Sequence, residues 1–191
     1  MEIKIVPETP DVLTEYEKVS IAFRVRSAFS VELVEKGLGG IKLVENKVTP
    51  PFIKNYDDHE SERPSQWAKR FDISNWGIFS AFVEEKRVGG AAVALGTPEV
   101  LMLEGHEDLA CLWDLRVAPE FRGKGIGHYL FLFSRLWAKE NKCRLLKVET
   151  QNINVPACRF YARQGFRLGG FNRYAYPESL NEIQLLWYLR L

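Results

Sequence analysis

Residues 112–127, Leu-Trp-Asp-Leu-Arg-Val-Ala-Pro-Glu-Phe-Arg-Gly-Lys-Gly-Ile-Gly, join a strand pattern to a helix pattern through a basic glycine loop. Residues 112–117 are apolar enough for a central strand, and Pro119 should end it because proline has no N–H group to donate to a ladder. A helix should follow the loop, since apolar residues recur there at helical spacing. They form one predicted apolar face: Ile126, Tyr129, Leu130, Phe133, Leu136 and Trp137.

The loop has the composition of an anion-binding site. The first N–H groups of a helix lack partners within the helix, and Gly123, Gly125 and Gly127 let a bulky anion approach them. Arg122 and Lys124 add positive charge. The spacing is neither that of the dinucleotide-binding fingerprint nor that of the nucleotide P-loop. The alternative is an ordinary tight turn, and we favour the phosphate site because the downstream chain agrees with it.

Length and composition indicate one soluble domain over residues 1–191. The net charge of +1 argues against a dedicated nucleic-acid binder, which needs a basic face. No apolar run approaches the ~18 residues that cross a bilayer, and the first residues lack a signal-peptide pattern. We therefore expect a cytoplasmic protein with neither a nucleic acid nor a membrane as partner. The oligomeric state stays open, with a homodimer as one alternative.

The cysteines and histidines predict neither a disulfide framework nor a metal site. Cys111, Cys143 and Cys158 are odd in number and far apart in the sequence. The three histidines are scattered and show no metal-ligand spacing.

Alternating and helical patterns predict an α/β fold. Strand, helix and strand between residues 112 and 150 call for a parallel, right-handed crossover within one sheet. Residues 21–33 and 41–48 alternate at period two and should form a long hairpin. Other expected strands are 2–6, ended by Pro7, then 76–84 and 88–95 with a turn within 85–87, and 166–171 and 183–191. Short helices are expected at 11–18 and 65–70, and a charged loop at 49–63.

A further helix, over residues 154–164, carries a second group of candidate residues. Asn154, Cys158 and Tyr161 are spaced i, i+4 and i+7, so they share a face across two turns. Asn154 also suits an N-cap, and Tyr161 could be only a packed aromatic residue. Cys158 lacks a histidine partner in the sequence, so we interpret it as a small buried residue rather than a nucleophile.

Two motifs together resemble the GNAT superfamily of N-acyltransferases. They are Arg122-x-x-Gly125-x-Gly127 after Val117-Ala118-Pro119, and Asn-x-Pro-Ala-x-x-x-Tyr-x-x-x-Gly-Phe over residues 154–166. The resemblance implies a GNAT-like mixed central sheet, with antiparallel N-terminal strands and a parallel central pair splayed for acetyl-CoA, flanked by helices. In that superfamily two helices normally wall the acceptor site, so the hairpin expected over residues 21–48 is a departure.

The resemblance also implies roles for particular residues. The loop would bind the coenzyme A pyrophosphate, the preceding strand would pair with the pantetheine arm, and the Tyr161 hydroxyl would approach the coenzyme sulfur. The implied cofactor-binding residues are Leu115, Arg116, Val117, Arg122, Gly123, Lys124, Gly125, Ile126, Gly127, Asn154, Cys158 and Tyr161.

Further stretches resemble the streptothricin acetyltransferases, which acetylate a primary amine of the antibiotic's β-lysine arm. This resemblance implies a role in antibiotic resistance. These stretches are Glu149-Thr150-Gln151, residues 154–158, Gly165-Phe166-x-Leu168-Gly169-Gly170, and Tyr56-Asp57-Asp58 before Phe79. An acidic loop is usually solvated surface, but beside a cationic acceptor it can steer an ammonium group. The expected substrate-binding residues are Tyr56, Asp57, Asp58 and Glu60.

An ammonium acceptor must lose its proton before it attacks a thioester. Asp114, Glu149 or a water chain could take that proton, and we rank Asp114 first because it matches an acidic position in relatives that acetylate small amines. The alternative for Asp114 is a carboxylate paired with Arg116. Tyr161 is expected to serve the departing thiolate. Three functions remain open: a small-amine N-acetyltransferase, a protein N-acyltransferase, and a non-catalytic coenzyme A binding or sensing domain.

Overall fold

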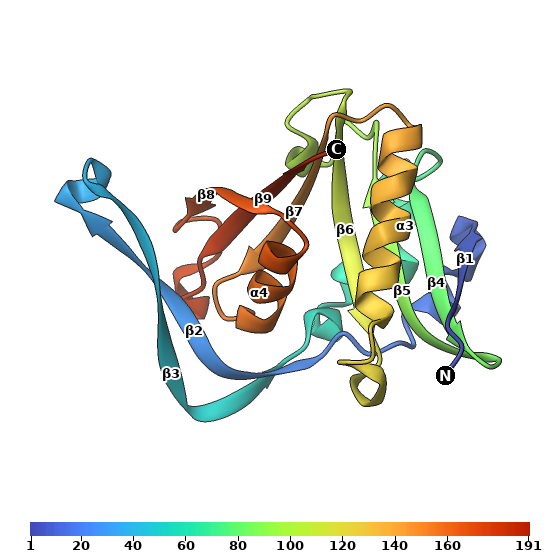
Figure 1. The fold of residues 1–191 in the computed structure, drawn as a ribbon, viewed down its shortest axis with the longest axis horizontal. Helices are drawn as coiled ribbons and strands as arrows, with labels where there is room; N and C mark the ends of the chain where they lie inside the picture. The colour runs from blue at the N-terminus through green and yellow to red at the C-terminus, as the bar shows by residue number, and fades with distance from the viewer. The chain divides into compact units, whose positions relative to one another are not determined.

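The computed structural model describes all of residues 1–191 and divides them into two units. The first unit comprises Met1–Ala22, Asn55–Val148 and Tyr188–Leu191, and the second comprises Phe23–Lys54 and Glu149–Trp187. Seven strands follow one another in the hydrogen-bonding order β1-β4-β5-β6-β7-β9-β8, and β2 and β3 form a separate two-stranded sheet (Figure 1). None of the helices is long and apolar enough to span a membrane.

The first unit is built on four antiparallel strands, β1 (Lys4–Glu8), β4 (Gly77–Val83), β5 (Lys86–Ala94) and β6 (Leu109–Val117). β6 then pairs in parallel with β7 (Leu145–Gln151), and the connection between them is α3 (Ile126–Glu140). α3 packs against β4, β5 and β6 (Figure 1). The predicted fold class is confirmed, with antiparallel strands first, a parallel central pair and flanking helices.

The buried face of α3 differs from the predicted one. The helix buries Ile126, Leu130, Phe131, Ser134 and Ala138. Three residues of the predicted face remain exposed, Tyr129 at 48%, Phe133 at 40% and Leu136 at 55%. The prediction is confirmed for Ile126 and Leu130 and wrong for these three residues, because apolar residues occupy most sides of this helix and spacing alone does not identify the side that meets the sheet. The small Ser134 can be buried because its hydroxyl donates to the Leu130 carbonyl at 2.8 Å.

The first strand and the segment after it also differ from expectation. Pro7 lies inside β1 instead of ending it, because β1 is an edge strand that pairs only with β4 and leaves one side of its backbone without a ladder. The helix expected at 11–18 is a 3-10 turn, η1 (Pro10–Val12), followed by a single turn, α1 (Leu13–Tyr16). The hairpin turn expected within 85–87 falls at residues 84–85, between β4 and β5.

The charged loop expected at 49–63 is partly strand, since β3 (Gly40–Lys54) continues through its first residues. Two 3-10 turns follow, η3 (Tyr56–Asp58) and η4 (Glu60–Glu62). The short helix expected at 65–70 is confirmed as η5 (Pro64–Gln66) and α2 (Trp67–Arg70). Two further 3-10 turns in the first unit are η6 (Leu101–Leu103) and η7 (Pro119–Phe121). β6 ends at Val117, before Pro119, as predicted.

The second unit contains the predicted hairpin. β2 (Phe23–Val34) pairs antiparallel with β3 as a long, bent ribbon, with η2 (Glu35–Gly37) at the turn (Figure 1). The departure from a helical segment is therefore confirmed. The unit also contains α4 (Val155–Arg163), β8 (Arg167–Asn172), η8 (Glu178–Leu180) and most of β9 (Gln184–Arg190).

Candidate active site

The glycine loop and the first turn of α3 have the geometry of an anion cradle. Gly123 and Gly125 take φ angles of 77° and 87°, in the left-handed region that glycine tolerates. A Cβ atom built on Gly123 would meet nothing within 4 Å, so the loop is open there. The first intrahelical bond joins the Tyr129 N–H to the Gly125 carbonyl at 3.1 Å. The N–H groups of Ile126 and Gly127 precede that bond and have no partner inside the helix.

Two basic side chains frame this cradle. Arg122 donates from Nε to the Val117 carbonyl at 2.8 Å and from Nη2 to the Ser20 carbonyl at 3.3 Å, which ties the loop to the end of β6. The Lys124 ammonium lies 4.9 Å from the centre of the Phe121 ring. Both side chains bring positive charge to a loop whose backbone already favours an anion.

The backbone of β6 is open on one side beyond its first residues. β5 pairs with β6 as far as Val117, whereas the parallel ladder with β7 covers only residues 109–111 and 145–147. Leu115 and Val117 therefore have no strand partner on the β7 side. An extended chain with amide groups, such as pantetheine, can pair with a strand of this kind.

A β-bulge lies at the point where the two ladders diverge. Asp114 stands opposite Ala92 and Leu112 opposite Val93, so Trp113 is the extra residue. Its ring packs against Phe71 and Trp76, at centroid distances of 5.4 and 5.6 Å. The bulge thus fixes the direction of β6 through a packed aromatic cluster.

The Arg116 side chain is buried in a fully hydrogen-bonded network within the first unit. Nε and Nη2 donate to Asp114 at 2.9 and 2.7 Å, and Nη1 and Nη2 donate to Asp57 at 2.9 and 3.3 Å. Nη1 also donates to the Val19 carbonyl at 3.1 Å. These bonds use all of the N–H groups of the guanidinium. The ion pair between Asp114 and Arg116 confirms the alternative stated for Asp114, whereas the contact of Asp57 with the same guanidinium was not predicted from the sequence.

Tyr16 completes this network, because its hydroxyl donates to Asp114 Oδ1 at 2.6 Å. Burial and the nearby Asp114 charge raise the pKa of Tyr16 well above its usual value, so the phenol stays neutral. Burial disfavours the charge on Arg116, but attraction to Asp114 outweighs it and raises the guanidinium pKa. Sequence reasoning missed Tyr16, and no local signal could have found it because it lies 98 positions from Asp114.

The other two acids of the predicted substrate site, Asp58 and Glu60, lie outside this network. Asp58 is exposed and accepts a hydrogen bond from the Asn55 side chain at 2.7 Å. Glu60 is exposed, and Tyr56 is half-buried. Asp57 is the one residue of the four expected substrate-binding residues whose carboxylate forms an ion pair with Arg116.

In the second unit, the α4 residues follow the predicted pattern. The Asn154 side chain accepts the Ala157 N–H at 3.2 Å, so the predicted N-cap is confirmed. Cys158 is buried, with its Sγ 3.2 Å from the Thr150 hydroxyl, and burial raises the pKa of the thiol to about 11. Tyr161 is also buried, and its ring contacts Phe166 edge-on at a centroid distance of 5.4 Å.

Glu149 is the first residue of the second segment of the second unit and is half-buried on β7. Its Oε1 accepts the Tyr176 hydroxyl, and its Oε2 accepts the Gln184 side-chain amide at 2.7 Å. Both partners are neutral, in contrast to the charged partner of Asp114. Sequence reasoning missed Tyr176 and Gln184, which lie 27 and 35 positions from Glu149.

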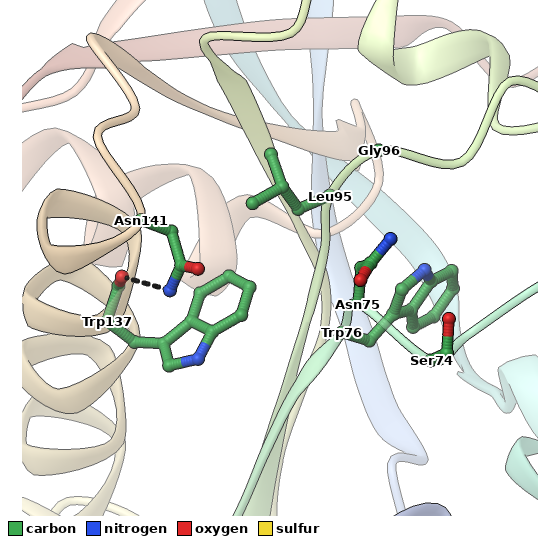
Figure 2. A pocket seen from close by; sticks show the side chains of 7 residues that line it. All are labelled: Ser74, Asn75, Trp76, Leu95, Gly96, Trp137 and Asn141. Atoms are coloured by element: carbon green, nitrogen blue, oxygen red, sulfur yellow. Dashed lines mark hydrogen bonds between the residues drawn. The ribbon is translucent and has the colours of Figure 1, made fainter.

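A cavity of about 350 Å³ in the first unit contains none of these residues. Figure 2 shows Trp137 of α3 and Asn141, the residue after α3, on one side of it and the ends of the β4–β5 hairpin on the other. The Asn141 amide donates to the Trp137 carbonyl at 2.9 Å, so the polar group is used at the end of the helix. This cavity is therefore separate from the candidate site residues.

The antiparallel sheet passes into a parallel pair, a glycine cradle lies at the start of the crossover helix, and an open strand edge lies beside it. This arrangement defines an acyltransferase fold built for a coenzyme A thioester. The model of the Acetyltransferase (GNAT) family matches residues 41–166, and the chain belongs to this family.

Individual relatives agree with this assignment over most of the chain. The chain is 29% identical over 192 residues to a streptothricin acetyltransferase of Escherichia coli, covering 98% of this chain and 95% of the relative. It is 28% identical over 148 residues to streptothricin acetyltransferase A of Bacillus subtilis (strain 168), covering 76% and 78%. A structure from Bacillus anthracis str. Ames, solved in complex with acetyl coenzyme A, shares the fold with a TM-score of 0.78 at 24% identity over all of both chains. The protein is therefore an acetyl-CoA-dependent N-acetyltransferase.

Proposed function

We propose that this enzyme acetylates a primary amine of a small cationic acceptor of the streptothricin kind. The observation that carries the proposal is the similarity to the Escherichia coli streptothricin acetyltransferase, which extends over 98% of the chain. That alignment includes the β2–β3 ribbon and the acidic turns, where the chain departs from the helices usual in the superfamily. A match confined to the cofactor motifs would carry no information about the acceptor.

On the donor side, the Ile126 and Gly127 N–H groups, with Arg122 and Lys124, hold the pyrophosphate of acetyl-CoA. The cradle fits this group because Gly123 leaves open space and Gly125 turns the chain into the helix. Leu115 and Val117 pair with the pantetheine amides through their backbone. Arg116 supports this strand from its buried network and does not contact the cofactor with its side chain.

In the second unit, α4 contributes Asn154, Cys158 and Tyr161 to cofactor binding. The Tyr161 hydroxyl donates a hydrogen bond to the sulfur as negative charge develops there. Cys158 is not a nucleophile, because burial keeps its thiol protonated at neutral pH. The bound thioester supplies an already activated acetyl group, so no acyl-enzyme is required.

The partners of the two acidic candidates favour Glu149 over Asp114 as the group that takes the acceptor's proton. An alkylammonium with a pKa near ~10.4 costs roughly 4.6 kcal/mol to deprotonate at neutral pH. Asp114 is buried, and its two oxygens accept hydrogen bonds from the Arg116 guanidinium and the Tyr16 hydroxyl, so it is held as the counter-ion of Arg116. Glu149 has only the neutral donors Tyr176 and Gln184. Asp114 then acts by holding Arg116.

On the acceptor side, Asp58 and Glu60 attract the cationic acceptor and Tyr56 contributes a partly buried surface beside them. Both carboxylates are exposed and neither forms an ion pair. Asp57 cannot bind the acceptor in the same way because its two oxygens bind Arg116, so it holds η3 in place.

The test is a thiol-release assay with acetyl-CoA over streptothricin, aminoglycosides, polyamines and lysine-containing peptides. The expected result is a kcat/KM for streptothricin at least about 100-fold above that for any peptide, with the acetylated amine located by mass spectrometry. Replacing Asp58 and Glu60 by Asn and Gln should raise the streptothricin KM and weaken its salt dependence, with acetyl-CoA binding unchanged. Preference for a peptide would instead assign the enzyme to protein acetylation.

A further inference from the structure

A cavity of about 370 Å³ in the second unit concentrates positive charge that nothing in the acetyl-transfer reaction uses. Its charged lining residues are four arginines and a single acid, Arg24, Arg26, Arg159, Arg163 and Glu45, and Ser27, Val155 and Pro156 complete the lining. The whole chain carries a net charge of only +1, so this concentration is local.

The arginines come as two like-charged pairs from two different elements. Arg24 and Arg26 lie two apart on β2 and are exposed, while Val25 between them is 1% exposed, so both arginines project from the same face of the ribbon. Arg159 and Arg163 lie four apart on α4 and are likewise exposed. Like charges at that helical spacing repel each other. Both pairs converge on one cavity, which adds repulsion between the elements.

The one acid in the cavity is already used. Glu45 accepts the Ser27 hydroxyl at 2.6 Å and pairs with Arg159. No carboxylate pairs with Arg24, Arg26 or Arg163. Three guanidinium groups thus face the cavity without a counter-charge from the protein.

We propose that this four-arginine cavity binds the phosphate group of a phosphate monoester. A phosphate monoester carries about −1.5 to −2 charge near pH 7 and three acceptor oxygens. It can therefore bind several guanidinium groups at once, which a carboxylate ligand with one charge and two oxygens does less well. The start of α4 is not what attracts the anion. Asn154 already caps it, and Pro156 has no N–H to offer. The phosphate can be the ribose 3′-phosphate of coenzyme A or can belong to a separate ligand.

The experiment titrates inorganic phosphate into the enzyme saturated with dephospho-coenzyme A. That cofactor retains the pyrophosphate, which fills the glycine cradle, but lacks the 3′-phosphate. The test variant is Arg24→Gln with Arg163→Gln, and the matched control is Arg167→Gln with Arg190→Gln, two exposed arginines outside the cavity. Phosphate affinity should fall at least about tenfold in the test variant and stay within about twofold of wild type in the control.

A second comparison identifies the source of the phosphate. If the wild type binds coenzyme A more tightly than dephospho-coenzyme A and the test variant abolishes that difference, the cavity takes the cofactor's own phosphate. If the difference survives while inorganic phosphate binding is lost, the ligand is separate. Equal phosphate affinity in wild type and test variant would overturn the proposal. The comparison of coenzyme A with dephospho-coenzyme A rests on the proposed cofactor binding. If that proposal fails, neither cofactor binds, and this result is distinct from a loss of phosphate binding. Phosphate is then titrated into the enzyme alone.

Discussion

Arg116 and Asp57, which lie 59 positions apart, are joined by two hydrogen bonds of 2.9 and 3.3 Å between guanidinium and carboxylate. The Arg116 side chain is 1% exposed and that of Asp57 is 16% exposed, so the pair is shielded from water. This contact fixes η3 to the central strand β6. The residues on either side of Asp57, which we propose to meet the acceptor, therefore depend on an arginine in the core of the sheet.

Asp57→Asn should destabilise the fold by about 1–3 kcal/mol, because it leaves the buried Arg116 with one fewer anionic partner. Urea denaturation measures this as a lower midpoint at an unchanged slope. The control is Asp58→Asn, which removes an exposed charge bound only to Asn55 and should cost less than about 0.5 kcal/mol. Equal midpoints for the two variants would show that the Arg116 network does not anchor η3.

Gly127→Ala should weaken acetyl-CoA binding about tenfold or more, because a Cβ in the first turn of α3 obstructs the approach of the pyrophosphate to the backbone. Gly127 is preferable to Gly125, whose φ of 87° would add backbone strain on substitution. Alanine is a better helix former than glycine, so stability should not fall. Calorimetric titration with acetyl-CoA gives the affinity, and wild-type affinity in this variant would remove the cradle from the cofactor site.

Tyr161→Phe should lower kcat by about 10- to 100-fold, since a thiolate is a fair leaving group and the hydroxyl acts mainly by hydrogen bonding. The ring contacts with Phe160 and Phe166 are retained, so stability and acetyl-CoA affinity should change little. Tyr174→Phe is the matched control, because Tyr174 is 87% exposed. A wild-type kcat for Tyr161→Phe, with chemistry shown to limit the rate, would contradict the assignment.

Glu149→Gln should lower kcat/KM for the amine by about 100-fold. Asp114→Asn should act differently, because it disturbs the contacts with Arg116 and Tyr16 and so lowers stability as well as activity. The two variants are compared by kcat/KM for the amine together with urea denaturation. A folded Asp114→Asn enzyme that loses more of its kcat/KM than Glu149→Gln does would reverse the order of the two candidates.

Cys158 should resist alkylation in the folded enzyme at pH 8. Burial raises its pKa to about 11, above the ~8.5 of an unfolded thiol, so the neutral thiol contributes stability below pH ~8.5 and that contribution is lost as the pH rises toward 11. Iodoacetamide labelling followed by mass spectrometry measures the modification, with urea-unfolded protein as the fully reactive reference. Rapid labelling at pH 8 without loss of structure would contradict the assigned burial.

The sequence by itself determined the parts of this protein that depend on local chemistry. Pro119 ends β6, the loop glycines permit the turn into α3, and Asn154 caps α4, because each effect acts within a few residues of its cause. The strand, helix and strand order between β6 and β7 allowed only a parallel crossover. The period-two pattern also predicted the β2–β3 ribbon, against the helices usual in the superfamily.

Only the tertiary structure decided which side of α3 is buried and which groups the acidic residues contact. The helix has apolar residues on most of its sides, so the sheet and not the spacing selects the buried face. Asp57, Arg116 and Tyr16 meet across 59 and 98 positions of sequence, and Glu149 finds Tyr176 in the same way. Hydrogen bonds and ion pairs of this kind depend on distances of about 3 Å between atoms that the fold brings together, and no local pattern in the sequence predicts those distances.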